Sequence, residues 1–142
     1  MTGSASCELC RQPGGEVLVQ RPAFRVVLVD EPGYPGFCRV IRQAHAAEMT
    51  DLSPAERSEL MDTVWRVEEA LREVMQPAKI NLASFGNMVP HVHWHLIPRF
   101  ADDQHFPAPT WAAARRAADP ERIAARTALL PALRDAIIRR FS

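Results

Sequence analysis

The amino-acid sequence predicts an α+β fold with a mainly antiparallel sheet of about five strands, one long helix and a C-terminal helical segment. Short runs rich in Val, Leu and Ile are separated by Pro, Gly and polar residues, which is typical of neighbouring strands. One longer stretch has the apolar spacing of an amphipathic helix. Strands and helices come in blocks and do not alternate, which argues against a doubly wound parallel sheet.

The first three strands are expected at residues 16–20, 24–29 and 37–42. The Arg-Pro pair at 21–22 separates the first two runs, which predicts a hairpin or meander. Residues 30–36 contain two prolines and two glycines, and this composition predicts a loop before the third strand.

The long helix is expected over roughly residues 54–75. Ser53 and Glu56 have the spacing of a capping box, and Pro54 lies between them at the first helical position. Pro77 cannot continue the helix and marks its end. The apolar residues that recur at three- and four-residue steps are Leu60, Met61, Val64, Val67, Leu71 and Val74.

Two more strands are expected after the helix, at residues 79–84 and 91–98, with a glycine-containing turn between them. A second helical pattern follows near the end of the chain. Asp119 is its expected N-cap and Pro120 its first residue. Pro131 is expected to break or kink this helix, because proline removes a helical hydrogen bond.

The chain has 142 residues, the length of one ordinary domain, and we expect a single domain over residues 1–142. Within it, residues 1–6 are expected to be disordered, and residues 101–142 to form an extension packed on the domain. Lys and Arg together number 17, as do Asp and Glu, so the formal net charge is zero. This balance argues against a partner that is a nucleic acid or an anionic membrane.

Targeting signals are missing from the sequence as given. It begins with no apolar leader, and no stretch has the apolar length of a transmembrane helix. The chain carries three cysteines, an odd number. Together these features predict a cytoplasmic protein with reduced thiols.

The stretch PHVHWHLIPR holds three histidines at every second position: His91, His93 and His95. In a strand these side chains share one face, and the apolar residues between them share the other. Three imidazoles in a row are a poor core and indicate a site. Metal-dependent hydrolases usually add a carboxylate to such a run, and here the nearest downstream acids are Asp102 and Asp103, beyond the strand.

Cys7 and Cys10 have the two-residue spacing of zinc ligands. This spacing alone has two interpretations. The pair is either part of a metal site or lies in a free, mobile N-terminal segment.

The histidine run resembles the signature of the histidine triad (HIT) family, in which apolar residues separate three histidines. Flanking segments resemble the family in the same order along the chain. They place Asp30 where the family has an acidic residue, His45 after a strand, and Asn87 where Gln is usual. The resemblance covers roughly residues 7–100.

The resemblance implies a HIT-like fold that hydrolyses nucleoside phosphates or transfers a nucleotidyl group. Diadenosine polyphosphates and nucleoside phosphoramidates are the implied substrate types, and no cofactor is required for the chemistry. His93 is the implied nucleophile and forms a covalent nucleotidyl-histidine, because a neutral imidazole approaches phosphorus without charge repulsion. Its far nitrogen is expected to donate to a backbone carbonyl, and His95 to assist departure of the leaving group.

The same resemblance implies ligands for the nucleotide and for a metal. Nucleotide-binding residues would be Asp30, which accepts from ribose hydroxyls, together with Asn81, Asn87, His93 and His95. A structural zinc would be held by Cys7, Cys10, His45 and His91, which divides the triad between structure and catalysis. Members of the family usually form homodimers.

One departure from the family pattern keeps alternatives open. Phe37 lies where many relatives carry another histidine, and phenylalanine cannot share a proton. The chain is therefore an enzyme, a slow one if this histidine matters, or a non-catalytic nucleotide-binding protein with the same fold. A metal-dependent hydrolase that uses the triad as its ligands is a third interpretation.

Overall fold

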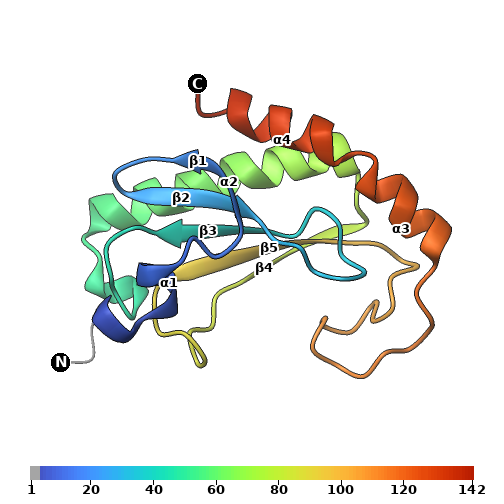
Figure 1. Ribbon diagram of the computed structural model, residues 1–142, viewed down its shortest axis with the longest axis horizontal. Helices are drawn as coiled ribbons and strands as arrows, with labels where there is room; N and C mark the ends of the chain where they lie inside the picture. The colour runs from blue at the N-terminus through green and yellow to red at the C-terminus, as the bar shows by residue number, and fades with distance from the viewer. Residues whose placement is uncertain (1–3) are drawn as a thin grey trace.

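In a computed structural model, which describes residues 4–142, five strands form one sheet in the order β1-β2-β3-β5-β4 (Figure 1). Every neighbouring pair is antiparallel, which confirms the predicted fold class. The bounds are β1 Glu16–Gln20, β2 Phe24–Leu28, β3 Cys38–Arg42, β4 Lys79–Ala83 and β5 His93–Arg99.

The long helix α2 spans Pro54–Met75, as predicted. Its capping box is formed: the Glu56 amide donates to Ser53 Oγ at 3.2 Å, and the Ser53 amide donates to Glu56 Oε1 at 2.7 Å. The other helices are α1 Glu8–Arg11, α3 Pro120–Thr127 and α4 Leu130–Arg139, with 3-10 turns η1 Ser4–Ser6 and η2 Met49–Asp51. No helix among residues 4–142 is long and apolar enough to cross a membrane.

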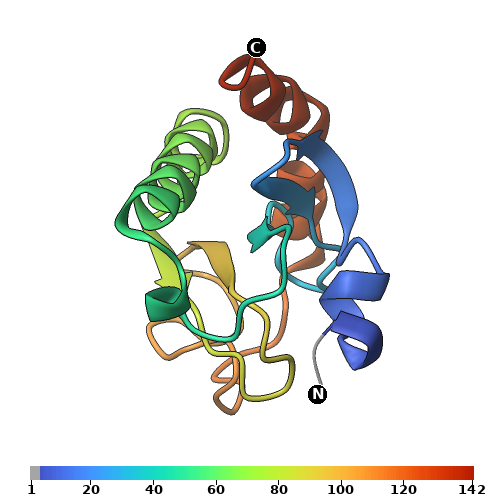
Figure 2. The same ribbon diagram turned by 90° about the vertical axis from the view of Figure 1, so that its left-hand side faces the viewer.

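Helices α2 and α4 lie together over one face of the sheet (Figures 1 and 2). Alternate residues of the strands point to this face and pack against the apolar stripe of α2. Burying these side chains is the main source of the domain's stability. The fully buried members of this core include Val26, Val40, Val64, Val67, Leu71, Leu96, Leu133 and Ile137.

The opposite face of the sheet carries the polar side chains. The antiparallel register pairs Arg39 with His95, and Ile41 with His93, on the neighbouring strands β3 and β5. Helix α1 packs on this side through Leu9, which shares a small core cluster with Ile41. The face that bears the histidines is therefore partly covered and partly open.

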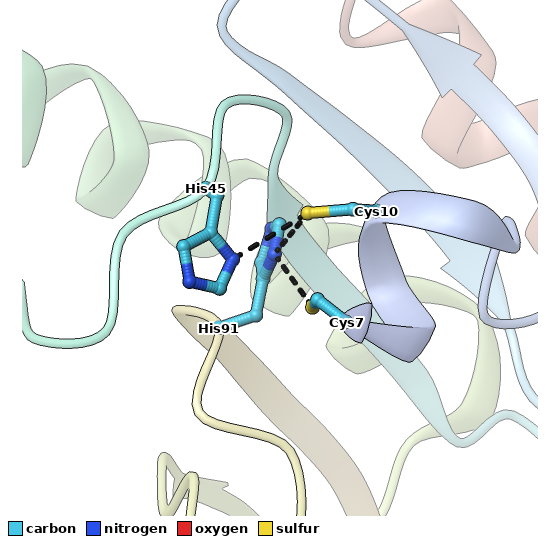
Figure 3. A group of neighbouring side chains, drawn as sticks. All are labelled: Cys7, Cys10, His45 and His91. Atoms are coloured by element: carbon cyan, nitrogen blue, oxygen red, sulfur yellow. Dashed lines mark hydrogen bonds between the residues drawn. The ribbon is translucent and has the colours of Figure 1, made fainter. Parts of the chain in front are cut away.

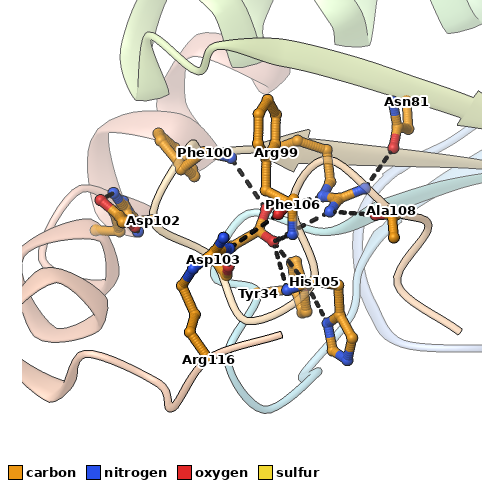
Figure 4. A network of polar contacts seen from close by, with 11 residues as sticks. Tyr34, Asn81, Arg99, Phe100, Asp102, Asp103, His105, Phe106, Ala108 and Arg116 are labelled. Atoms are coloured by element: carbon orange, nitrogen blue, oxygen red, sulfur yellow. Dashed lines mark hydrogen bonds and ion pairs between the residues drawn. The ribbon is translucent and has the colours of Figure 1, made fainter. Parts of the chain in front are cut away.

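The segment that follows β5 is held to the sheet by a buried ion pair (Figure 4). Arg99 donates to Asp103 at 2.8 and 3.0 Å, and both side chains are almost fully buried. The backbone amides of Phe100, His105 and Phe106 also donate to the Asp103 carboxylate. Burial alone would raise the pKa of this carboxyl, but these donors lower it to about 2.

The predicted start of the fifth strand is wrong. Strand β5 begins at His93, so His91 and Val92 lie before the strand, where the Val92 amide donates to the Ala46 carbonyl at 2.8 Å. The expected disorder over residues 1–6 falls partly outside the described residues, and Ser4–Ser6 form a 3-10 turn. The tail helix is interrupted at residues 128–129, and Pro131 lies in the first turn of α4, consistent with the predicted break.

Candidate functional site

The His93 ring is held in one orientation by a hydrogen bond to the chain just before it. Its Nδ1 donates to the His91 carbonyl at 2.6 Å, which is the predicted contact to a backbone carbonyl. The Ser84 hydroxyl donates to the His93 carbonyl at 2.8 Å and holds the start of β5 to the residue that follows β4. A proton on Nδ1 leaves Nε2 as a lone pair, so the ring presents a nucleophilic nitrogen.

The His95 ring lies beside His93, with ring centroids 4.9 Å apart and planes at 88°. Phe37 contacts it edge-on at 5.5 Å, and Phe85 lies 6.2 Å away. The buried Nδ1 of His95 has no hydrogen-bond partner among the described residues. Phe37, at the position where many members of the resembling family carry a histidine, thus forms an apolar wall of the site.

Both imidazoles favour the neutral form. Burial, the His93 ring and the cation of Arg39 lower the pKa of His95 to about 4. Burial also lowers the pKa of His93, although its hydrogen bond to the His91 carbonyl acts in the opposite direction. A neutral pair suits attack on an anionic phosphorus centre, where a lone pair is needed on one ring and an N–H donor on the other.

Arg39 is a site residue that the sequence reading missed. It is the cross-strand partner of His95, and its charge acts on both His93 and His95. Its Nη1 donates to the Gly14 carbonyl at 3.0 Å, and its buried Nε has no partner among the described residues. The signal was present in the sequence, because Arg39 is the one charged residue inside an otherwise apolar run, FCRVI.

The first histidine of the run belongs to a different group of side chains (Figure 3). Its Nδ1 lies 3.4 Å from both Cys7 Sγ and Cys10 Sγ, and His45 Nδ1 lies 3.4 Å from Cys10 Sγ. The candidate ligand atoms of Cys7, Cys10, His45 and His91 all lie within 4.8 Å of one another. The structure therefore brings together the four residues that the sequence analysis grouped as metal ligands.

This donor set fits a tetrahedral metal ion. Zn–S and Zn–N bonds of ordinary length would place sulfur and nitrogen ligands about 3.5 Å apart, close to the 3.4 Å seen at three contacts. His91 Nε2 donates to the Arg42 carbonyl at 2.5 Å, which leaves Nδ1 unprotonated and aimed at the two thiols. Such backbone support for the far nitrogen is typical of metal-ligating histidines.

The helix α1 explains how the cysteines reach this position. Cys7 is its N-cap residue, and the amides of Cys10 and Arg11 donate back to the Cys7 carbonyl at 3.2 Å. This single turn brings the two thiols to the same side, and burial of Leu9 holds it on the sheet. The alternative of a free, mobile segment is wrong for these residues.

The predicted nucleotide-binding residues are dispersed. Asn81 lies on β4, where its Oδ1 accepts from Arg99 at 2.8 Å, and its amide group remains for other partners. Asn87 is exposed in the loop between β4 and β5. Asp30 is exposed at a cavity of about 480 Å³ formed by residues after β2 and by α3 and α4. None of the three triad histidines lines that cavity.

Two exposed aromatic residues extend the wall beside His95. Phe85 is 57% exposed and contacts Trp111, which is 66% exposed, with ring centroids 5.1 Å apart. Trp111 comes from the segment after β5, so the C-terminal extension reaches the site. Its exposure excludes a role for Trp111 in the packed core.

Comparison with known proteins identifies one family. Residues 12–102 match the HIT domain. A curated relative, the bis(5'-nucleosyl)-tetraphosphatase (asymmetrical) of Schizosaccharomyces pombe, is 31% identical over 93 residues. That alignment covers 61% of this chain and 51% of the relative, so the chain spans about half of the length of the curated relative.

Solved structures show the same fold. A histidine triad protein from Bradyrhizobium japonicum is 28% identical, with a TM-score of 0.67 over 86% of this chain and 91% of that one. A Zn-bound histidine triad family protein from Mycobacterium smegmatis is 22% identical, with a TM-score of 0.67 over 96% of both chains.

Proposed function

The chain belongs to the HIT family, and on that premise we propose that it is a nucleotide hydrolase or nucleotidyl transferase whose nucleophile is His93. The observation that carries this proposal is the 2.6 Å hydrogen bond from His93 Nδ1 to the His91 carbonyl. It fixes the tautomer with a lone pair on Nε2, which the reaction requires of a nucleophile.

In the proposed reaction, His93 Nε2 attacks the phosphorus of a phosphoanhydride or phosphoramidate. The bond from phosphorus to the leaving group breaks, and a covalent nucleotidyl-histidine forms. Water then attacks the phosphorus of this intermediate, and the P–Nε2 bond breaks with its electron pair returning to Nε2. The nucleoside monophosphate is released, and the proton lost by the water passes to solvent. Dividing the displacement into two steps lowers the barrier that each step must cross.

His95 is proposed to act on the leaving group. Its pKa of about 4 in the free protein makes it a neutral N–H donor at pH 7. An N–H aimed at the leaving atom, which is the bridging oxygen of a phosphoanhydride or the nitrogen of a phosphoramidate, stabilises the charge that develops there as the bond breaks. An anionic substrate beside the ring would also raise its pKa and bring it closer to that of an effective proton donor.

The proposed substrates are dinucleoside polyphosphates and nucleoside phosphoramidates. Support for the first class comes from the name of the curated relative, a dinucleoside tetraphosphatase. Asp30, Asn81 and Asn87 are proposed to contact the nucleotide, Asp30 through the ribose hydroxyls. Asp30 is supported by its exposed position at a cavity of suitable size for a nucleoside.

The Cys7, Cys10, His45 and His91 cluster is proposed to bind a structural zinc ion. Support comes from the donor set, the close approach of its atoms and the Zn-bound relative. A site with four protein ligands is closed, so the ion would supply a cross-link between α1 and the turn before β5. It would not take part in the chemistry.

This arrangement disfavours a metal-dependent hydrolase that uses the whole triad. Of the three histidines, only His91 belongs to the candidate metal cluster among the described residues. A non-catalytic nucleotide-binding protein is the stronger alternative, because Phe37 removes one proton-sharing group beside His95. These three functions give different outcomes in one experiment.

The experiment incubates the protein with diadenosine polyphosphates, adenosine phosphoramidate and dinucleotides of other bases, with and without prior chelation. The proposed enzyme releases nucleoside monophosphate under both conditions, as long as the chelated protein stays folded by circular dichroism. A metal-dependent hydrolase loses activity on chelation and regains it with added zinc. Binding without turnover of any substrate would contradict the proposal and support the non-catalytic function.

Assembly and location are also proposed. A homodimer is supported by the exposed Trp65 on α2 and by the position of β4 at the edge of the sheet. A cytoplasmic location is supported by the free state of Cys7, Cys10 and Cys38. Sedimentation of the purified protein tests the first of these directly.

A further inference from the structure

Arg39 is a cation on the histidine-bearing face of the sheet without a matching acidic partner. Its Nη1 donates to a backbone carbonyl, and it forms no ion pair with any carboxylate in residues 4–142. The carboxylates of Glu31 and Glu8 act on Arg39 only through the electrostatic field. A half-buried charge of this kind is costly unless an anion approaches it.

The position of Arg39 beside His95 is set by the backbone. The two residues are cross-strand partners in the antiparallel pair β3–β5, so their Cβ atoms lie about 5 Å apart on the same face. Buried side-chain polar atoms without a partner are few among the described residues. Two of the four lie on this pair, the Nε of Arg39 and the Nδ1 of His95. Unpartnered polar atoms on two cross-strand partners leave hydrogen-bonding capacity for a ligand beside this pair.

Phe37 helps to orient the guanidinium. The Arg39 Cζ lies 5.9 Å from the centre of the Phe37 ring, and the same ring makes a T-shaped contact with His95. Phe37 is 6% exposed and packs with Tyr34 and Ile97, so it is a fixed surface. The residue that replaces a proton-sharing histidine thus supports a permanent cation two positions further along the chain.

From these contacts we propose that Arg39 forms an anion subsite beside His95, in which the guanidinium donates to a phosphate oxygen of the nucleotide. The inference rests on the proposed function for the identity of the ligand, a nucleoside phosphate. Arginine keeps its charge at any working pH, and its fork of N–H donors matches phosphate oxygens. Arg39 is therefore a binding residue for the phosphate, and it orients phosphorus toward the His93 nucleophile.

The test measures binding and does not depend on turnover. Affinities of AMP, GMP, CMP and UMP, and of the four uncharged nucleosides, are measured by calorimetric and NMR titration. The proteins are wild type, Arg39→Met, Arg39→Lys and Arg72→Met. Arg72 is exposed on α2, on the other side of the sheet, and its substitution removes one positive charge without touching the site.

The proposal predicts that Arg39→Met weakens the best-bound monophosphate about 10- to 100-fold, as expected for a charge-assisted hydrogen bond. The parent nucleoside is expected to lose less than about twofold, because it carries no charge. Arg39→Lys keeps the charge and recovers part of the affinity, and Arg72→Met binds like wild type. A purely structural role of Arg39 would weaken nucleoside and nucleotide equally.

Three results would overturn the inference: an Arg39→Met affinity for the monophosphate within twofold of wild type, an equal loss for the nucleoside, or a wild type that binds none of the monophosphates. The proposed function fails separately. If the wild type binds nucleotides through Arg39 but cleaves no substrate, the anion subsite is supported and the proposed hydrolase function is contradicted. If Arg39→Met turns over substrate as fast as wild type, the hydrolase is retained and the anion subsite is contradicted.

Discussion

Two neighbouring imidazoles, His91 and His93, occupy different chemical environments although only one residue separates them. The first is fully buried before β5, and its Nδ1 is aimed at two thiols. The second lies inside β5, and its Nδ1 is bonded to the His91 carbonyl. The difference arises because the strand begins between them, so alternation along a sequence motif does not guarantee a shared function.

In each of the two rings, one nitrogen is bound by a backbone carbonyl and the other is left for a ligand or substrate. In His91 the backbone acceptor engages Nε2 and leaves Nδ1 for a metal ion, whereas in His93 the acceptor engages Nδ1 and leaves Nε2 for phosphorus. Each ring is thus prepared by one hydrogen bond for one task. The substitutions below separate the two tasks, in order of expected effect.

The largest effect is expected for His93→Ala. Removal of the nucleophile is expected to lower kcat by at least about 10⁴-fold, since the covalent intermediate cannot form. The metal content, measured by atomic emission, and the melting temperature are expected to stay close to wild type. His105→Ala is the control, because this histidine lies in the loop after β5 and stacks on Tyr34. Retention of most activity in His93→Ala would contradict its role.

The next largest effect is expected on stability, from Cys10→Ala. Loss of one of four ligands is expected to release the metal ion and to lower the melting temperature by roughly 10 °C. Cys38→Ala is the matched control, because its thiol is buried in the main core away from the cluster. If both variants keep equal metal content, or if Cys10→Ala melts like wild type, the cluster is not a structural metal site.

A smaller effect is expected on the pH dependence of stability. His95 has a pKa of about 4 when folded, below its ordinary value of 6.5, so the unfolded chain binds more protons between these pH values. The free energy of unfolding should therefore fall as pH decreases from 6.5 to 4. Burial lowers the pKa values of His91 and His93 as well, and they add to the same trend.

The variant His95→Asn isolates this contribution. It removes the titrating group and keeps a polar side chain, so its loss of stability from pH 6.5 to pH 4 should be shallower than that of wild type. Urea unfolding at several pH values measures both slopes. Equal slopes in the two proteins would show that His95 is not held in the neutral form by its surroundings.

The smallest effect is expected for Asp30→Asn. An exposed carboxylate that accepts from ribose hydroxyls contributes less than about tenfold to the preference for AMP over 2′-deoxy-AMP. The control is Glu31→Gln, a neighbouring carboxylate at the same cavity. If neither variant changes the preference, or both change it equally, Asp30 is not the ribose-binding residue.

Local signals in the sequence were sufficient for much of the fold. Helix α2 has its predicted bounds, because Ser53, Pro54 and Glu56 define its start through short-range hydrogen bonds. Strand β1 also has its predicted bounds, Glu16–Gln20. A long-range hydrogen bond decides where β5 starts. The Val92 amide donates to the Ala46 carbonyl, and His91 lies outside the strand. No local pattern encodes that contact.

Site residues that are recognised by their residue type could be predicted from the sequence. Site residues whose role depends on strand register could not. The cysteines and histidines of the metal cluster were grouped from their resemblance to a family, and the structure places them together. Arg39 was missed because its meaning depends on its pairing with His95, which only the register of β3 against β5 defines. The buried ion pair of Arg99 with Asp103 likewise depends on the folded chain, because the two side chains meet only there.

The central claim, that the triad is divided between structure and catalysis, is tested most directly by mapping the covalent intermediate. The protein is mixed with the best substrate of the panel, quenched with alkali within one turnover, digested and examined by mass spectrometry. The account predicts a nucleotidyl group on His93, with His91, His95 and His45 unmodified. Hydrolysis without any adduct, or an adduct on His91, would contradict it.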